Sequence, residues 1–321
     1  MRRLVVMAHY DAGGEVAPHV LRQVEALADV ADRLIVVSTA GLTPGGPAAT
    51  ALSRRAELVR RPNLGYDFYS WKTGLDLAAD LDGYDQVVIC NDSCIGPLDG
   101  YRPVFATMAQ RPADFWGITL TRRRALHVQS YFVAFGGHVA RSGSFRRFWQ
   151  EMTPVSDRAE VITRYELGLS GCLIDAGFRP GAYFVETARD RRVARARHLW
   201  FAAQTLRRLP AQRRRRVARR IAFEPWNPIT ALADRALDDA RLPLVKLDTL
   251  RFDPYGLDAA RLLAGCERRY PEQFAGVRDF LQRTAGAYPA RAGERAGERA
   301  GERAGPVRPP FGLRRLVGYH R

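Results

Sequence analysis

The residues best placed for chemistry in this sequence are Asn91, Asp92 and Ser93. They follow four apolar residues, Val87 to Cys90, a run long enough for a strand that is buried on both faces. In an open α/β sheet, ligands bind in the crevice outside the carboxyl ends of the strands, so an acid at this place is a candidate for binding. The alternative is that Asp92 only caps a turn, because Asp and Asn are ordinary turn residues.

Two more polar segments follow expected strands. His9, Tyr10 and Asp11 come after the apolar run Leu4 to Ala8. A loop that contains Asn63, Gly65 and Asp67 comes after a short strand at 57–59 and leads into a helix expected from about residue 68 to 79. Asp67 could cap that helix or face the same crevice as Asp92, and the two interpretations are compatible.

A further candidate group lies in the middle of the chain. Residues 126–135 alternate in character, which predicts a strand with His127 and Gln129 on one face, where they could hydrogen-bond to sugars or phosphates. A lone His is more often structural than catalytic, but with Gln129 on the same face the structural and functional interpretations of His127 stay equally open. Glu166 lies in a helix expected over 161–177 with apolar residues on either side, so it is either at the surface or an acid turned inward.

The order of elements predicts the class of fold. A strand at 4–8, a helix at 16–27 and a strand at 33–38 begin a parallel α/β sheet, to which 113–119 and 178–185 add strands. Residues 243–253 are expected to be extended, with helices on either side. We predict a sheet core over 1–205, a helical extension packed on it over 206–285, and a disordered Arg-Ala-Gly-Glu repeat with a basic tail over 286–321.

The charge and the cysteine content limit the classes of partner and the cellular compartment that can be expected. The 321-residue chain has a formal net charge of +16, but only Lys72 and Lys246 are lysines and no nucleic-acid recognition motif accompanies the arginines, so we expect no nucleic-acid partner. The basic run 213–216 and the tail could contact anionic lipid. Four scattered cysteines predict no disulfide framework, and no signal peptide or long apolar run is evident. We therefore expect a cytoplasmic protein, with peripheral contact at the inner face of the membrane.

The motifs together resemble the rhamnan synthesis protein F family of bacterial glycosyltransferases. The resemblance covers about 250 residues, and the segments that carry it are His9 to Asp11, Asn63 to Lys72, Asn91 to Ser93 with Gly96-Pro97, Asp114 to Gly117, His127 to Phe132, Tyr165-Glu166, Gly177-Phe178, Trp226 to Pro228, Leu244 to Lys246 and Leu250-Arg251.

The resemblance implies a fold similar to the GT-A nucleotide-sugar transferases and a donor such as dTDP-rhamnose, used on a glycan or a lipid-linked acceptor. Strand one and the loop would hold the nucleotide, and Asn91 to Ser93 would stand in the place of the Asp-x-Asp metal motif. Only Asp92 keeps a carboxylate there, so binding of Mg²⁺ or Mn²⁺ would depend on one acid and the phosphates.

The resemblance also implies roles for single residues. Glu166 is expected as the general base, His127 and Gln129 as contacts to the acceptor or donor sugar, and Lys72 or Arg122 to Arg124 as the positive charge near the diphosphate. Two alternatives stay open at this point. One is a catalytically inactive transferase-like partner module, which the reduced metal motif would explain; the other is a membrane- or polyanion-binding protein, which the net charge would explain.

Overall fold

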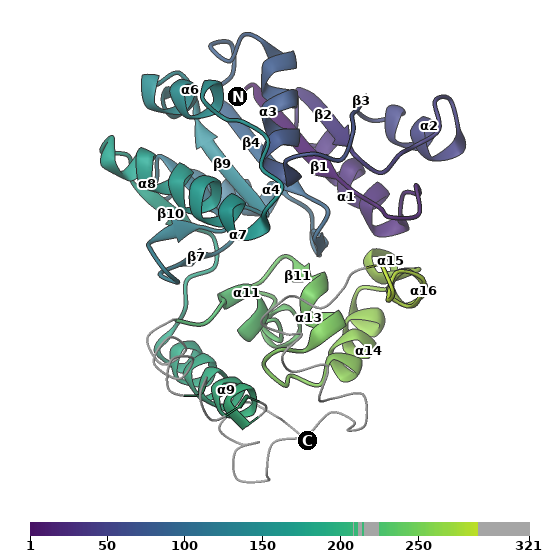
Figure 1. The fold of residues 1–321 in the computed structure, drawn as a ribbon, viewed down its shortest axis with the longest axis vertical. Helices are drawn as coiled ribbons and strands as arrows, with labels where there is room; N and C mark the ends of the chain where they lie inside the picture. The colour runs from purple at the N-terminus through teal and green to yellow at the C-terminus, as the bar shows by residue number, and fades with distance from the viewer. Residues whose placement is uncertain (208, 211–213, 215–224, 288–321) are drawn as a thin grey trace.

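A seven-stranded sheet lies at the centre of the protein, with helices on both faces (Figure 1). The computed structural model describes residues 1–207, 209–210, 214 and 225–287. The strand order is β10-β6-β9-β4-β1-β2-β3, and β9 runs antiparallel to both of its neighbours while the other pairs are parallel. The strands are β1 Arg3–His9, β2 Arg33–Ser38, β3 Glu57–Arg60, β4 Gln86–Asn91, β6 Phe115–Gly117, β9 Phe132–Gly136 and β10 Pro180–Ala182. The predicted α/β class with a mostly parallel sheet is confirmed.

Two short pairs of strands lie outside this sheet. β5 (Cys94–Ile95) pairs with β11 (Val245–Lys246), and β7 (Leu120–Thr121) pairs with β8 (His127–Val128). The helices are α1 Pro18–Ala28, α2 Pro47–Ser53, α3 Tyr66–Ala78, α4 Arg102–Ala109, α5 Gly137–Ala140, α6 Gly143–Gln150, α7 Arg158–Val161, the π-helix η1 Ile162–Glu166, α8 Leu167–Asp175, α9 Ala188–Arg207, α11 Pro228–Ala231, α12 Arg235–Asp238, α13 Leu247–Phe252, α14 Ala259–Arg269, α15 Pro271–Phe274 and α16 Val277–Arg283.

The central strands are buried on both faces because alternate side chains feed two separate apolar clusters. Val5 and Met7 of β1 belong to a cluster with α1, α4 and the C-terminal helices. Leu4 and Val6 belong to a second cluster with α3, α6 and α8. The two faces of the sheet therefore carry different sets of helices. The polar residues that follow β1 and β4 lie at the carboxyl ends of these strands, between the two faces.

The helix expected over 161–177 is present as α7, η1 and α8, with a π-helical turn in its first half. Two other local predictions were wrong. The strand expected over 126–135 is broken between β8 and β9, so His127 and Gln129 do not share the face of one strand. The segment expected to be extended over 243–253 forms only β11 before it becomes α13, because Leu247 onward packs as a helix against the apolar cluster of α1.

The C-terminal helices share the core of the sheet. Ile229, Leu244 and Phe274 are buried in the same apolar cluster as Val5 of β1. Figure 1 shows α11 to α16 gathered below the sheet, on the side towards which its parallel strands run. A Cβ atom at Gly96, whose φ is +135°, would lie 2.7 Å from the carbonyl oxygen of Pro243, so only glycine allows the chain before β11 to lie this close. The C-terminal helices therefore pack on the core of the sheet.

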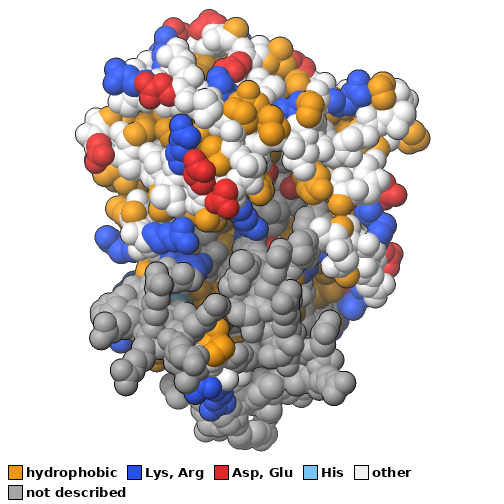
Figure 2. Space-filling view, in the orientation of Figure 1, with side chains coloured by type: hydrophobic (Ala, Val, Ile, Leu, Met, Phe, Trp, Pro, Cys, Tyr) orange, Lys and Arg blue, Asp and Glu red, His pale blue; other side chains and the backbone are white. Residues whose placement is uncertain are grey.

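The boundary at 205/206 stays a prediction, although α9 packs against α11 and so groups with the extension. The repeat and tail over 288–321 lie outside the described residues, as does the basic run 213–216 except for Arg214. Across the described ranges, no helix combines the length and the apolar character needed to cross a bilayer. On the face drawn in Figure 2, acidic and basic side chains are interspersed over the sheet region.

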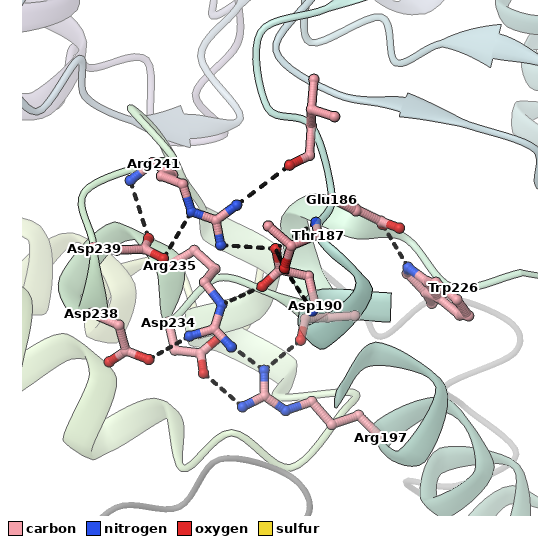
Figure 3. A network of polar contacts seen from close by, with 12 residues as sticks. Glu186, Thr187, Asp190, Arg197, Trp226, Asp234, Arg235, Asp238, Asp239 and Arg241 are labelled. Carbon is pink, nitrogen blue, oxygen red and sulfur yellow. Dashed lines mark hydrogen bonds and ion pairs between the residues drawn. The ribbon is translucent and has the colours of Figure 1, made fainter. Parts of the chain in front are cut away.

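A buried network of ion pairs ties α9 to the segment that follows α11 (Figure 3). Asp190 is 1% exposed and accepts hydrogen bonds from Arg235 and Arg241, each at 2.8 Å. Arg197 binds Asp234 through two hydrogen bonds of 2.8 and 2.7 Å. Burial alone would raise the pKa of Asp190, but hydrogen bonds from Thr187 and Arg241 outweigh it and lower that pKa to about 2.

We expect Asp190→Asn to lower the free energy of unfolding by about 3 kcal/mol, because it leaves the buried Arg235 guanidinium without its full partner. The matched control is Asp239→Asn, which removes the carboxylate of a 38% exposed side chain that pairs with Arg241. It should lower the free energy of unfolding by less than about 1 kcal/mol. Urea denaturation at pH 7 measures both. Equal losses for the two variants would show that the buried pair adds nothing beyond a surface ion pair.

Candidate active site

Asn91 ends β4 and binds the carboxylate of Asp67 at the edge of the sheet. Its Nδ2 atom donates to Oδ2 of Asp67 at 2.8 Å, and its Oδ1 atom accepts from the backbone N and the Oγ of Ser93 at 3.2 and 2.6 Å. Asp67 lies in the first turn of α3. Burial raises the pKa of Asp67, and the hydrogen bond from Asn91 partly offsets this. Asn91 thus positions an acid rather than supplying one.

Asp92 is the second carboxylate of this pair. Its Oδ2 atom accepts a hydrogen bond from the backbone N of Tyr10 at 2.8 Å, which joins the ends of β1 and β4. The side chain is half-buried, and burial raises the pKa of Asp92 to about 8, with the charges of Asp67 and Asp11 acting in the same direction. The two acids therefore repel each other at the place where a cation would be bound.

Glu166 reaches the same place from the face of the sheet that carries α3. It is the last residue of η1, and π-helical turns are frequent at functional sites. Its Oε1 atom accepts from the backbone N and the Oγ of Ser130 at 3.3 and 2.9 Å. Its charge is close enough to raise the pKa of Asp67. The structure thus brings the predicted base to the carboxylate pair, while its catalytic role stays a prediction.

Lys246 supplies a positive charge at the site. The sequence analysis gave this residue no role. Its Nζ atom donates to Oγ of Ser93 at 3.2 Å and lies 5.0 Å from the ring centroid of Tyr131. Lys72, the predicted cation, pairs with Asp76 at 2.9 Å further along α3. The sequence held one usable signal, since Lys246 is one of only two lysines in an arginine-rich chain.

The other predicted cations lie elsewhere. Arg122, Arg123 and Arg124 are exposed in the turn between β7 and β8. In contrast, Arg251 of α13 lies with Asp92 and Ser93 in the lining of one cleft. Its Nη2 atom donates to Oγ1 of Thr284 at 2.6 Å, which fixes the guanidinium.

The residues after β1 line that same cleft. His9 is buried, and its Nδ1 atom lies 2.9 Å from Oγ of Ser38; burial lowers the pKa of His9 to about 4, so its ring is neutral at pH 7. Asp11 accepts from the backbone N of Gly13 at 2.7 Å and pairs with Arg283 of α16 at 3.4 Å. His9 and Asp11, two of the three residues predicted here to bind the sugar donor, are thus held in place by neighbouring polar groups. Tyr10 lies between them in the sequence.

The loop before α3 leads the chain to Asp67 in the first turn of that helix. Asn63 is exposed, and neither it nor Gly65 lines the cleft. Gly65 has a φ of +73°, and a Cβ atom there would lie 2.7 Å from Cβ of Tyr69, so its role is to let the chain turn into α3. Their predicted contacts with a donor stay predictions.

His127 and Gln129 are enclosed by the protein. Nδ1 of His127 lies 2.9 Å from the carbonyl oxygen of Ala125, and Oε1 of Gln129 accepts from Oγ1 of Thr119 at 2.6 Å. Both side chains are less than 9% exposed. The structure therefore gives them a packing role at the turn into β9, and their contact with an acceptor stays a prediction.

A divalent cation fits the carboxylate pair. Within the described ranges, no group of three or more His, Cys, Asp or Glu side chains is placed to hold a metal ion by itself. However, the pKa values of both Asp67 and Asp92 are raised, so their ionised forms are disfavoured in the unliganded protein. A bound cation would stabilise those ionised forms. Mg²⁺ is often held by one or two carboxylates together with substrate phosphates, and these two acids meet that requirement.

Comparison with known families agrees with the sequence resemblance. A family model described as Rhamnan synthesis protein F matches residues 34–238, which is more than half of the chain. The chain belongs to this family. The matched region includes Asp67, Asp92 and Glu166 but ends before Lys246 and Arg251. Family membership therefore covers the acids of the site, and its two C-terminal cations lie beyond the match.

Curated relatives match a shorter part of this family member. It is 30% identical over 116 residues to the Virulence protein VirA of Vibrio anguillarum, which is 35% of this chain and 36% of that protein. It is 25% identical over 118 residues to the uncharacterized protein y4gN of Sinorhizobium fredii, which is 35% of this chain and 31% of that protein. The chain thus spans about a third of the length of these relatives.

Solved structures give weaker likenesses. S. aureus TarS (1–349) is 11% identical, covers 91% of this chain and 93% of its own, and has a TM-score of 0.37; it has also been solved with UDP-GlcNAc. Glucosyl-3-phosphoglycerate synthase from Mycobacterium tuberculosis, solved with Mn²⁺ and uridine diphosphate, is 14% identical, covers 56% of this chain and 70% of its own, and has a TM-score of 0.32. No residue role is transferred from these structures.

Proposed function

We propose that the protein is a glycosyltransferase of the GT-A type, which transfers a sugar from a nucleoside-diphosphate donor to a growing cell-surface polysaccharide or a lipid-linked glycan. Membership of the Rhamnan synthesis protein F family supports rhamnose as the sugar and dTDP-rhamnose as the donor. The observation that carries the proposal is the convergence of two acids, a base and a cation at the edge of the sheet. They are Asp67, Asp92, Glu166 and Lys246.

Each group has a task in the reaction. Glu166 accepts the proton of the acceptor hydroxyl, whose oxygen then attacks the anomeric carbon of the sugar. The bond from that carbon to the diphosphate breaks, and its electron pair leaves on the diphosphate oxygen. Lys246, held beside Ser93, stabilises that negative charge. Asp92 and Asp67 would hold a divalent cation, which when bound supplies further positive charge to the diphosphate.

The alternative of an inactive partner module rested on the single carboxylate in Asn91-Asp92-Ser93. Asp67 weakens that argument, because Asn91 fixes it as a second acid beside Asp92. An acceptor carried on a lipid would also require the protein to work at the inner face of the membrane. The exposed Arg189, Arg192 and Arg195 of α9 support such a contact, and co-sedimentation with anionic vesicles tests it.

Turnover of sugar nucleotides tests the proposal directly. The purified protein is incubated with dTDP-rhamnose, UDP-GlcNAc or UDP-glucose, with Mn²⁺ or with a chelator, and a membrane glycan fraction as acceptor. We expect release of nucleoside diphosphate and transfer of the sugar for one donor, with less of both in the chelator. A result in which no donor is used above buffer hydrolysis, while the protein is folded, would instead favour the inactive partner module.

A further inference from the structure

Lys246 comes from the C-terminal part of the chain and reaches the site through a short pair of strands. β11 pairs with β5 so that Lys246 lies opposite Cys94, and the backbone N of Leu247 donates to the carbonyl oxygen of Ser93 at 3.0 Å. These contacts fix the backbone of Lys246, whereas its flexible four-carbon side chain has to be held by other groups. A cation stabilises a leaving group best when its position is fixed before the reaction.

Ser93 is the first group that holds the ammonium. Its Oγ atom accepts a hydrogen bond from Nζ of Lys246 at 3.2 Å and donates one to Oδ1 of Asn91 at 2.6 Å. A hydroxyl has one proton, so donating it to Asn91 turns the lone pairs of Ser93 towards Lys246. Asn91 in turn binds Asp67 through its amide nitrogen at 2.8 Å. The ammonium and this acid are therefore joined by one chain of hydrogen bonds.

The ring of Tyr131 is the second group that holds the ammonium. Nζ of Lys246 lies 5.0 Å from the ring centroid, within the range of a cation–π attraction. The side chain of Tyr131 is 4% exposed, and burial raises its pKa, so the phenol keeps its proton and attracts Lys246 through the ring face. The backbone N of Asn91 donates to the carbonyl oxygen of Tyr131 at 3.2 Å, which keeps Tyr131 beside the Asn91–Ser93 segment.

Two buried polar residues orient Tyr131. Oγ1 of Thr119 donates to Oε1 of Gln129 at 2.6 Å and lies 2.7 Å from the hydroxyl oxygen of Tyr131. The amide oxygen of Gln129 can only accept, so Thr119 gives its one proton to Gln129 and accepts the proton of Tyr131. Thr119 is fully buried and Gln129 is 8% exposed, so water does not compete for these bonds. The hydroxyl end of the ring is thus fixed while its face lies towards Lys246.

We propose that Ser93 and Tyr131 are positioning residues, which hold the ammonium of Lys246 at the place where the diphosphate leaves. Thr119 and Gln129 act through Tyr131. The proposal rests on the proposed function. Negative charge on the diphosphate oxygen grows as its bond to the anomeric carbon breaks. A cation already in position therefore lowers the barrier to transfer more than it strengthens donor binding.

The lysine content of the chain makes the position of Lys246 measurable by NMR. Lys72 and Lys246 are its only lysines, so protein labelled with ¹³C at the ε carbon of lysine gives two lysine signals, which Lys72→Arg assigns. Protons above the face of an aromatic ring are shifted upfield. We expect this upfield shift for Lys246 in the wild type and in Tyr131→Phe, and its loss in Tyr131→Leu. Inorganic diphosphate with Mg²⁺ should move the signal of Lys246 and leave that of Lys72 unchanged.

Transfer rates connect the position of Lys246 to the reaction. We expect single-turnover rates about tenfold lower in Tyr131→Leu and in Ser93→Ala. Tyr131→Phe keeps the ring and Ser93→Thr keeps the Oγ atom, so both should recover most of the rate. The affinity for UDP and dTDP, measured by calorimetry, should fall less than the rate. Tyr183→Leu is the matched control, because it removes a ring that faces Arg111 at 6.0 Å next to the edge strand β10, and it should keep the rate of the wild type.

Two outcomes would overturn the positioning role alone, while a wild type that uses a donor leaves the proposed function standing. One is a wild-type rate in both Tyr131→Leu and Ser93→Ala. The other is a Lys246 signal that Tyr131→Leu does not move. If the wild type uses no donor and diphosphate does not move the Lys246 signal, the proposed function fails together with the positioning role. Should Tyr131→Leu not fold, Ser93→Ala decides: a loss of rate that Ser93→Thr restores supports the proposal, and an unchanged rate contradicts it.

Discussion

Asp92→Asn is expected to lower the rate of sugar transfer about 10²- to 10³-fold while making the unliganded protein more stable. The amide keeps an oxygen for the hydrogen bond from the backbone N of Tyr10, so the local structure should persist. It removes the negative charge that would bind the cation and, through it, the diphosphate. Initial rates and the affinity for Mn²⁺ with donor present measure the loss.

The gain in stability has a predicted dependence on pH. Burial raises the pKa of Asp92 to about 8, whereas an exposed Asp titrates at about 4. Between these values the unfolded chain loses the proton and the folded protein keeps it, so Asp92 makes the wild type less stable as pH rises from 4 to 8. Asp92→Asn removes this effect. Its melting temperature in chelator should exceed that of the wild type at pH 8 and match it near pH 4.

The matched comparison is Asp76→Asn, which removes the 60% exposed carboxylate that pairs with Lys72 in α3. It should change neither the rate nor the pH dependence of the melting temperature. A wild-type rate in Asp92→Asn would remove the carboxylate pair from the mechanism, whatever the stability of the variant.

The sheet could be predicted from the sequence because its strands are buried on both faces. Four consecutive apolar residues before Asn91 leave few alternatives to a central strand, and the polar residues that follow must then lie at the sheet edge. The same reasoning placed Asp67 and Asp92 at one crevice, and the structure joins them through Asn91. Periodicity therefore predicted the central strands and the position of Asp92 directly after one of them.

The remaining features depend on contacts between distant parts of the chain. Lys246 reaches Ser93 because β11 pairs with β5, and the sequence separation of 153 residues gives no local sign of this. His127 alternates with Gln129 as in a strand, yet Nδ1 of His127 contacts the carbonyl oxygen of Ala125 two residues away, and Gln129 accepts a hydrogen bond from Thr119. The cleft lined by Asp92 and Arg251 depends on distant contacts as well, since one of its walls comes from α13 and α16.

Glu166→Gln is expected to slow sugar transfer about 10²- to 10⁴-fold with little change in donor affinity. Gln keeps an Oε1 atom that can accept from Ser130, so the side chain should hold its position, but it cannot take the proton of the acceptor. Single-turnover rates from pH 5 to 9 and calorimetric titration with the donor separate the two effects.

Glu160→Gln is the matched control, because Glu160 is 52% exposed in α7, close in sequence to Glu166, and pairs with the exposed Arg164. It should retain the rate of the wild type. If Glu166→Gln also retains that rate, the proton must go to another acid at the same edge. Asp67 is then the candidate, since Asn91 holds it there and Glu166 is near enough to raise its pKa. If donor affinity falls as much as the rate, Glu166 binds the sugar and the base lies elsewhere.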